Sequence, residues 1–131
     1  MKLHESGQMY LETIYLLSKE KSEVRSLDVA EKIGYSQPSV CRAMGILRRG
    51  GFIIMDKDSF ITLTDEGREY AEKLYDRHTT LTEFLIKLGI TPKTAADDAC
   101  KIEHDLSDES FRVIKAHVLR AGNNGGPNAG L

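Results

Sequence analysis

The chain has 131 residues, of which 40% are hydrophobic and 29% are charged. This length and composition are typical of one small globular domain, or of two that share an interface, and they exclude a large barrel enzyme. No apolar run reaches the roughly 18 residues of a membrane span, the amino terminus has no apolar signal core, and two cysteines do not make a disulfide framework. We therefore expect a cytoplasmic protein that does not enter a membrane.

The net charge of −2 is unevenly distributed along the chain. Residues 1–64 hold nine basic and eight acidic side chains, whereas residues 65–131 hold nine basic and twelve acidic ones. Between residues 36 and 57 a single acid accompanies four bases, Arg42, Arg48, Arg49 and Lys57. A local basic patch on a mildly acidic chain favours a nucleic-acid-binding face, with an ordinary solvated surface as the alternative.

Three helices are predicted in the first part of the chain. An apolar stripe at helical spacing places the first over residues 7–20. Ser26 is the expected N-cap of a short second helix, and Gly34 suits its left-handed end. Ser36 and Pro38 form the start signal of the third helix, which runs to about residue 49.

A hairpin and three further helices are predicted after the third helix. Two short β-prone runs, at 52–55 and 60–63, indicate the hairpin. Thr64 is the expected cap of a long helix that ends near residue 88. Another helix is expected over residues 92–105, and Ser107 is the expected cap of the last one.

This order of elements predicts the fold class and the domains. Two short helices at a tight turn, with a helix before them and a two-stranded ribbon after them, make a winged helix-turn-helix. We therefore predict a mainly α protein, with a winged helix-turn-helix domain at 1–64 and a helical domain at 65–120. The Asn- and Gly-rich residues 121–131 are expected to form a disordered tail.

The predicted third helix carries the candidate DNA contacts. In a winged helix-turn-helix this helix lies in the major groove and presents its first residues to base edges. The residues concerned are Ser36, Gln37, Pro38, Ser39 and Arg42. Gln can pair with adenine and Arg with guanine, whereas Arg48, Arg49 and Lys57 are better placed for phosphates. Cys41 adjoins the apolar stripe of this helix, so we expect it to pack rather than react.

A second group of residues has the character of metal ligands. Cys100, Glu103 and His104 stand at positions i, i+3 and i+4, which share one face of a helix. His78 lies among apolar neighbours of the long helix, and Met9 and Glu12 form an i, i+3 pair on the first helix. Packing these three helices together would gather all six side chains. Each residue also fits ordinary packing or solvation, so the spacing alone leaves a metal site and a structural cluster open.

These motifs resemble those of the diphtheria-toxin-repressor family of metal-dependent bacterial repressors, which includes the iron-dependent repressors and the manganese transport regulator. The resemblance covers about residues 5–118. It rests on Met-Tyr-Leu-Glu-x-Ile-Tyr at 9–15, the turn motif, Leu-Thr-x-x-Gly at 63–67, Arg-His at 77–78 and Cys-x-x-Glu-His at 100–104. It implies a homodimer with an N-terminal DNA-binding domain, a helical domain that dimerises, and a divalent ion that bridges the two.

The resemblance also implies a ligand set. Met9, Cys100, Glu103 and His104 match the pattern of the iron-responsive members, whereas manganese-responsive members have Asp and Glu in place of the first two. Glu12 and His78 match the remaining ligands of the manganese-type centre, and His78 also matches an ancillary-site ligand of the iron type. Thioether and thiolate donors suit the softer ions. We therefore expect Fe²⁺ first and Mn²⁺ second.

Three departures from the family pattern bear on this expectation. Thr82 stands where members usually carry a carboxylate four residues after the histidine, and Ala96 stands where the iron type has a histidine. Both count against a complete ancillary site. The third, SH3-like domain of the longer members is missing, as expected of a short form or a shortened chain.

The sequence thus predicts a metal-dependent transcriptional regulator, a repressor by resemblance, that binds a palindromic operator in double-stranded DNA and controls iron or manganese homeostasis. One alternative is a metal-independent winged-helix regulator that senses redox state or a small molecule through Cys100. An enzyme with Cys100 as nucleophile and His104 as base lacks an oxyanion-hole loop. A pure protein-interaction module leaves the basic helix unexplained.

Overall fold

The computed structural model describes residues 3–123, with side chains described up to residue 120. The chain divides into two compact units, an N-terminal unit, Met1–Lys73, and a C-terminal unit, Leu74–Leu131. The elements along the described residues are α1 (Glu5–Glu20), α2 (Ser26–Ile33), α3 (Gln37–Arg49), β1 (Ile53–Met55), β2 (Ile61–Leu63), α4 (Asp65–Lys87), α5 (Pro92–Ile102) and α6 (Asp108–Asn123). The division falls within α4. Of the predicted tail, residues 124–131 lie outside the described part of the chain.

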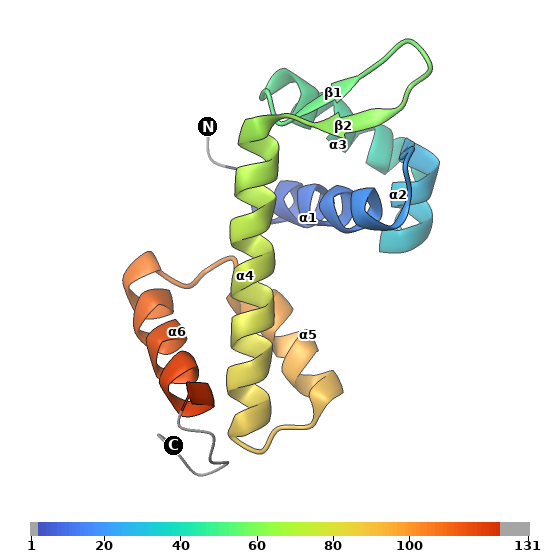
Figure 1. Cartoon of the computed structure of the whole chain (residues 1–131). Coiled ribbons are helices and arrows are strands. Elements are labelled where there is room, and N and C mark those ends of the chain that lie inside the picture. Colours follow the sequence, from blue (N-terminus) through green and yellow to red (C-terminus); the bar gives the residue numbers. More distant parts are fainter. Residues whose placement is uncertain (1–2, 124–131) are drawn as a thin grey trace. The chain divides into compact units, whose positions relative to one another are not determined.

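The N-terminal unit is a winged helix-turn-helix, as the sequence predicts. Helices α1, α2 and α3 pack on one another, and β1 and β2 form the wing (Figure 1). Apolar side chains from every one of these elements make the core, including the fully buried Leu11, Ile14, Val29, Val40, Leu47 and Phe52. The predicted stripe of α1 is buried throughout. On α3, Met44 lies in the core and the neighbouring Ala43 is half-buried.

The wing is a two-stranded antiparallel ribbon in which Ile54 pairs with Thr62. Its turn is closed by the Asp56 carboxylate, whose Oδ1 accepts bonds from the backbone N–H groups of Asp58 and Phe60 at 2.8 and 3.0 Å. Strand β2 is also joined to the loop before α2, because the N–H of Ile61 donates to the Val24 carbonyl at 2.7 Å. The wing is therefore attached to the helical part of the unit at the start of β2.

Two local details differ from the sequence-based expectation. Helix α2 begins at Ser26 itself, with Arg25 at the N-cap, because the Asp28 carboxylate reaches back and accepts the Arg25 N–H at 2.8 Å. Cys41 is exposed on α3 and does not pack. The expected left-handed stop is present at Gly34, with a φ of 83°.

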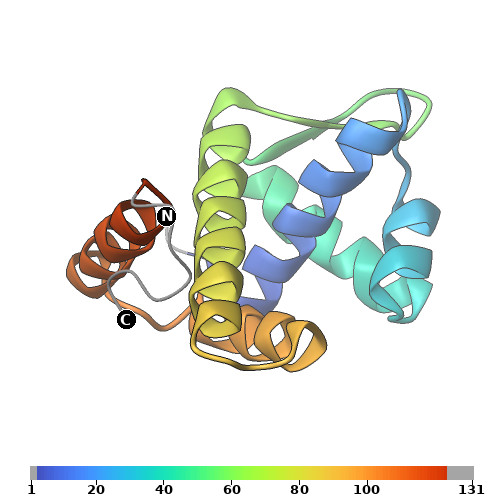
Figure 2. The ribbon, with the colours of Figure 1, turned by 60° about the horizontal axis from the view of Figure 1, so that its bottom comes forward.

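The C-terminal unit consists of the second part of α4 together with α5 and α6, which lie on different sides of α4 (Figures 1 and 2). Lys115 on α6 pairs with Asp76 on α4 at 2.6 Å. Helix α5 ends at Ile102, three residues before the predicted end. Glu103 is therefore the C-cap of α5, and His104 lies in the turn that follows.

Candidate DNA interface and metal centre

The start of α3 presents an exposed row of polar side chains. Ser36 caps the helix, and its hydroxyl donates to the Ser39 hydroxyl at 2.9 Å. The Arg42 guanidinium donates to the same Ser39 oxygen at 3.2 Å. Gln37 and Pro38 are exposed beside them. The predicted base-reading residues thus form one continuous surface on the first two turns of the helix.

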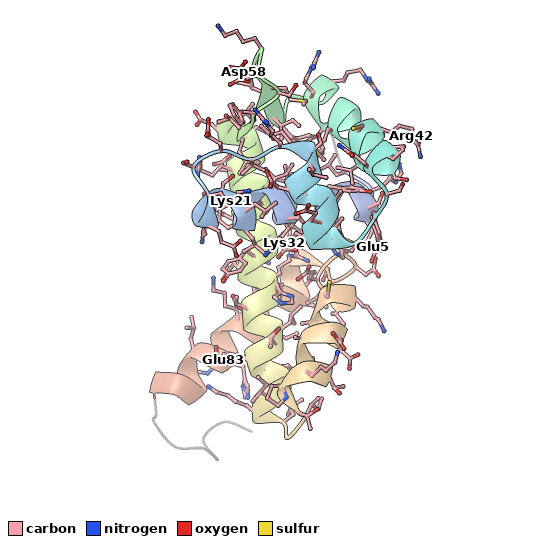
Figure 3. The ribbon with its side chains drawn as sticks, turned by 90° about the vertical axis from the view of Figure 1, so that its right-hand side faces the viewer. Glu5, Lys21, Lys32, Arg42, Asp58 and Glu83 are labelled. Carbon is pink, nitrogen blue, oxygen red and sulfur yellow. The ribbon has the colours of Figure 1, made fainter. Side chains whose placement is uncertain are left out.

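The basic side chains proposed for phosphate contact are all exposed on the same unit. Arg48 and Arg49 lie in the last turn of α3, and Lys57 lies in the turn of the wing. Figure 3 shows Arg42 on the outside of α3 and Asp58 at the tip of the wing. Exposed positive charge therefore lies in the second and last turns of α3 and in the turn of the wing, and basic side chains of this kind contact DNA phosphates.

Sequence reasoning missed Tyr35, which immediately precedes this row. Its side chain is 47% exposed, and its ring stands edge-on to that of Tyr10 at a centroid distance of 5.9 Å. Burial, with a smaller contribution from the neighbouring Tyr35, raises the pKa of Tyr10. Tyr35 thus extends the exposed surface while its neighbour belongs to the core. An aromatic residue directly before a helix cap was the available signal.

A buried carboxylate lies between two imidazoles in the C-terminal unit. Glu103 is 1% exposed. Its Oε2 lies 3.1 Å from Nδ1 of His78, which reaches it from α4. Its Oε1 lies 3.5 Å from Nε2 of His104. The fold therefore brings together three of the six predicted ligands.

The chemistry of these donors suits a divalent cation. Glu103 Oε1 is buried and accepts no hydrogen bond from any residue that the structure describes. A buried anion is costly unless positive charge or hydrogen bonds compensate it. Carboxylate and imidazole are both common ligands of divalent transition metals. Cys100 adds a half-buried thiol in the last turn of α5, three residues before Glu103.

The remaining two predicted ligands, Met9 and Glu12, belong to the N-terminal unit. Met9 and Glu12 lie on α1, and both are half-buried. Across residues 3–120 the structure gathers no group of three or more His, Cys, Asp or Glu side chains in the arrangement of a metal site. The complete ligand set therefore stays a prediction. Thr82, at the departing position, bonds to its own helix by donating to the His78 carbonyl at 2.7 Å.

Comparison with known proteins identifies the family. Residues 2–60 match the domain described as "Iron dependent repressor, N-terminal DNA binding domain", and residues 64–121 match "Iron dependent repressor, metal binding and dimerisation domain". An uncharacterised HTH-type transcriptional regulator of Methanocaldococcus jannaschii is 36% identical over 115 residues, which are 86% of this chain and 92% of that protein. The chain belongs to the iron-dependent repressor family.

Other members agree with this assignment. The transcriptional regulator MntR of Escherichia coli is 34% identical over 113 residues, covering 86% of this chain and 73% of MntR. The solved structure of the manganese regulator SloR superposes with a TM-score of 0.76 and 27% identity over 88% of this chain. The matched part of this chain spans 54% of the SloR chain.

The family assignment confirms the resemblance and the fold class predicted from the sequence. Members of the iron-dependent repressor family are metal-dependent transcriptional regulators. The family's two domains bind DNA and dimerise, respectively. None of the helices among the described residues has the length and hydrophobicity needed to cross a membrane.

Proposed function

We propose that this protein is a metal-dependent repressor that binds a palindromic operator in double-stranded DNA as a homodimer and controls genes of iron or manganese homeostasis. The exposed row on α3 reads the bases, and the basic residues of α3 and the wing contact phosphates. A dimer presents two such helices to half-sites about one helical turn apart, roughly 34 Å. Because it acts on chromosomal DNA, the protein works in the cytoplasm.

The proposed metal ligands are Met9, Glu12, His78, Cys100, Glu103 and His104. The observation that carries this proposal is the buried Glu103 carboxylate, which faces His78 at 3.1 Å and His104 at 3.5 Å. A bound divalent ion supplies the positive charge that this carboxylate needs. Because the ligands come from both units, their shared use joins α1 to the carboxyl end of α5 and favours operator binding.

We propose Fe²⁺ as the physiological ion, with Mn²⁺ as the alternative. The thioether of Met9 and the thiol of Cys100 support iron, because soft donors favour the later divalent ions over manganese. The similarity to MntR and to the manganese regulator SloR supports manganese. Intrinsic affinity does not decide between ions in the cell, where availability matters as much.

The test is fluorescence anisotropy of a labelled palindromic promoter fragment, run anaerobically with chelator, Fe²⁺, Mn²⁺ or Zn²⁺ in turn. The salt concentration is fixed, since salt alone changes DNA affinity by orders of magnitude. We expect a metal-dependent gain of about 5- to 150-fold. Glu103→Gln keeps the shape of the side chain but removes its charge, so we expect that gain to disappear.

The matched control is Glu109→Gln, which removes the same charge from an exposed position in the first turn of α6. It should keep the full metal response. A metal response that survives in Glu103→Gln contradicts the proposed centre. Equal DNA binding by the unmodified protein in chelator and in metal instead supports the metal-independent regulator that senses through Cys100.

A further inference from the structure

Two adjacent residues of α4 contact Glu103, one at its carboxylate and the other at its backbone carbonyl. His78 contacts the carboxylate, as described above. Arg77, its neighbour in sequence, donates from Nη1 to the backbone carbonyl of Glu103 at 3.1 Å. The same Nη1 donates to the Leu106 carbonyl, and Nη2 donates to the Asp108 carboxylate at the start of α6. Backbone and side chain of Glu103 are thus both fixed by α4.

The carbonyl contacts of Arg77 lie at the C-cap of α5 and in the loop just beyond it. The last carbonyls of a helix have no partner within it, and α5 ends at Ile102. The Arg77 guanidinium, which lies on another helix, donates to the carbonyl of the C-cap residue Glu103 and to that of Leu106 in the loop that follows. Charged donors make the stronger hydrogen bonds, and they make them best where water is scarce. The Arg77 side chain is only 14% exposed.

The ion pair with Asp108 contributes far less than the carbonyl contacts. The Asp108 side chain is 91% exposed. Exposed ion pairs add little because water and salt screen them. The two carbonyl contacts therefore contribute most of the stabilisation that Arg77 provides, and the Asp108 contact contributes little.

We propose that Arg77 is a positioning residue of the metal centre, which holds the Glu103 backbone so that the carboxylate stays between His78 and His104. This inference rests on the proposed function. It assigns a specific requirement for arginine, because only the planar fork of a guanidinium reaches several acceptors in fixed directions, whereas a lysine offers one point charge.

The test is titration of the protein with Co²⁺, monitored by its visible d–d absorption, which reports both affinity and the geometry of the ligands. Arg77→Lys keeps the charge and loses the fork. Residues that orient metal ligands typically change affinity by 10- to 100-fold. We therefore expect Arg77→Lys to weaken Co²⁺ binding by about 10- to 100-fold and to alter the d–d spectrum.

Asp108→Asn is the matched variant, because it removes the ion pair and leaves both carbonyl contacts. We expect its Co²⁺ affinity to stay within about 2-fold of the unmodified protein. All titrations are made well below the melting temperature of each variant, determined by circular dichroism. Arg77→Gln, whose amide can still donate to a carbonyl, replaces Arg77→Lys if the latter does not fold.

Two results overturn the inference. One is an Arg77 variant that melts earlier but binds Co²⁺ with unchanged affinity and spectrum, which reduces Arg77 to a structural role. The other is an Asp108→Asn loss as large as that of Arg77→Lys, which moves the effect to the ion pair. If the unmodified protein fails to bind Co²⁺ and Glu103→Gln makes no difference, the proposed function itself fails, which is a distinct outcome.

Discussion

Gly67 occupies the point where the first turn of α4 passes the residue that leads into the wing. A Cβ atom at this position would lie 2.0 Å from the carbonyl oxygen of Phe52 and 2.9 Å from its carbonyl carbon. The same Phe52 oxygen accepts the N–H of Thr64 at 3.1 Å, which restrains it. The requirement for glycine is therefore steric: no side chain fits between helix and backbone.

We expect Gly67→Ala to lower the free energy of unfolding by about 1–3 kcal/mol, the usual cost of forcing extra volume into a packed site. Gly45→Ala is the control, because its Cβ would meet only the flexible end of Arg49, at 3.4 Å within α3. It should raise stability by about 0.5–1 kcal/mol, since alanine favours helix over glycine. Urea denaturation of the metal-free protein measures both changes, and a Gly67→Ala protein as stable as the parent contradicts the steric argument.

At the scale of elements, the start of α2 depends on a carboxylate. Asp28 accepts the backbone N–H of Arg25 at 2.8 Å and pairs with the ammonium group of Lys21. The hydrogen bond from Lys21, followed by that from the Arg25 backbone, lowers the pKa of Asp28. Because the folded state favours the charged carboxylate, Asp28 contributes stability above its unfolded pKa of about 3.9. That contribution is lost as the pH falls through the folded pKa.

We therefore predict that Asp28→Asn lowers the free energy of unfolding by about 0.5–2 kcal/mol near neutral pH, the range measured for lost helix caps. The difference from the unmodified protein should shrink as the pH falls toward about 2, where both side chains are neutral. Urea midpoints across a pH series provide the measurement. Asp58→Asn, on the exposed wing tip, controls for the loss of one negative charge. A difference that is the same at every pH argues against the carboxylate.

Element boundaries also show where sequence reasoning stops. The N-cap hydroxyls of Ser36, Thr64 and Ser107 each accept the expected backbone N–H, at 3.4, 3.0 and 3.1 Å, because capping is a local property of the sequence. The contact at the end of α5 is not local, because the donor to the carbonyl of its C-cap residue, Glu103, is Arg77 on another helix.

At the scale of the whole molecule, the two candidate functions belong to different units. The DNA-reading row lies in the N-terminal unit, and the imidazole–carboxylate group lies in the C-terminal unit. Linkage between two sites is reciprocal by thermodynamic necessity. If metal tightens operator binding by a given factor, the operator must tighten metal binding by that same factor.

We predict that an operator fragment lowers the dissociation constant for Mn²⁺ by about 5- to 150-fold, equal to the metal-dependent gain in DNA affinity. Calorimetric titration with Mn²⁺, with and without saturating operator, measures the factor. A fragment of scrambled sequence at the same salt concentration is the control. A dissociation constant for Mn²⁺ that the operator leaves unchanged would contradict the proposed linkage between metal and DNA.

The fold and the types of ligand could be predicted from the sequence, but the geometry of the site could not. Helical and strand periodicity, with the caps, was enough for the winged helix. The pairing of His78 with Glu103 required α4 and α5 to pack together, which spacing could only suggest. The roles of Met9 and Glu12 as ligands remain predictions, because they depend on how elements from opposite ends of the chain come together.

The attachment of the wing to Val24 has a consequence for solubility. A strand edge with free N–H and C=O groups can recruit a strand from another molecule, and the exposed Ile54 on β1 would add to that attraction. On the outer edge of β2 the N–H of Ile61 is bonded to Val24, and both strands are only three residues long. Such a short edge offers too few bonds for another chain to join. The protein should therefore resist strand-to-strand aggregation at the high concentrations that crystallisation and calorimetry demand.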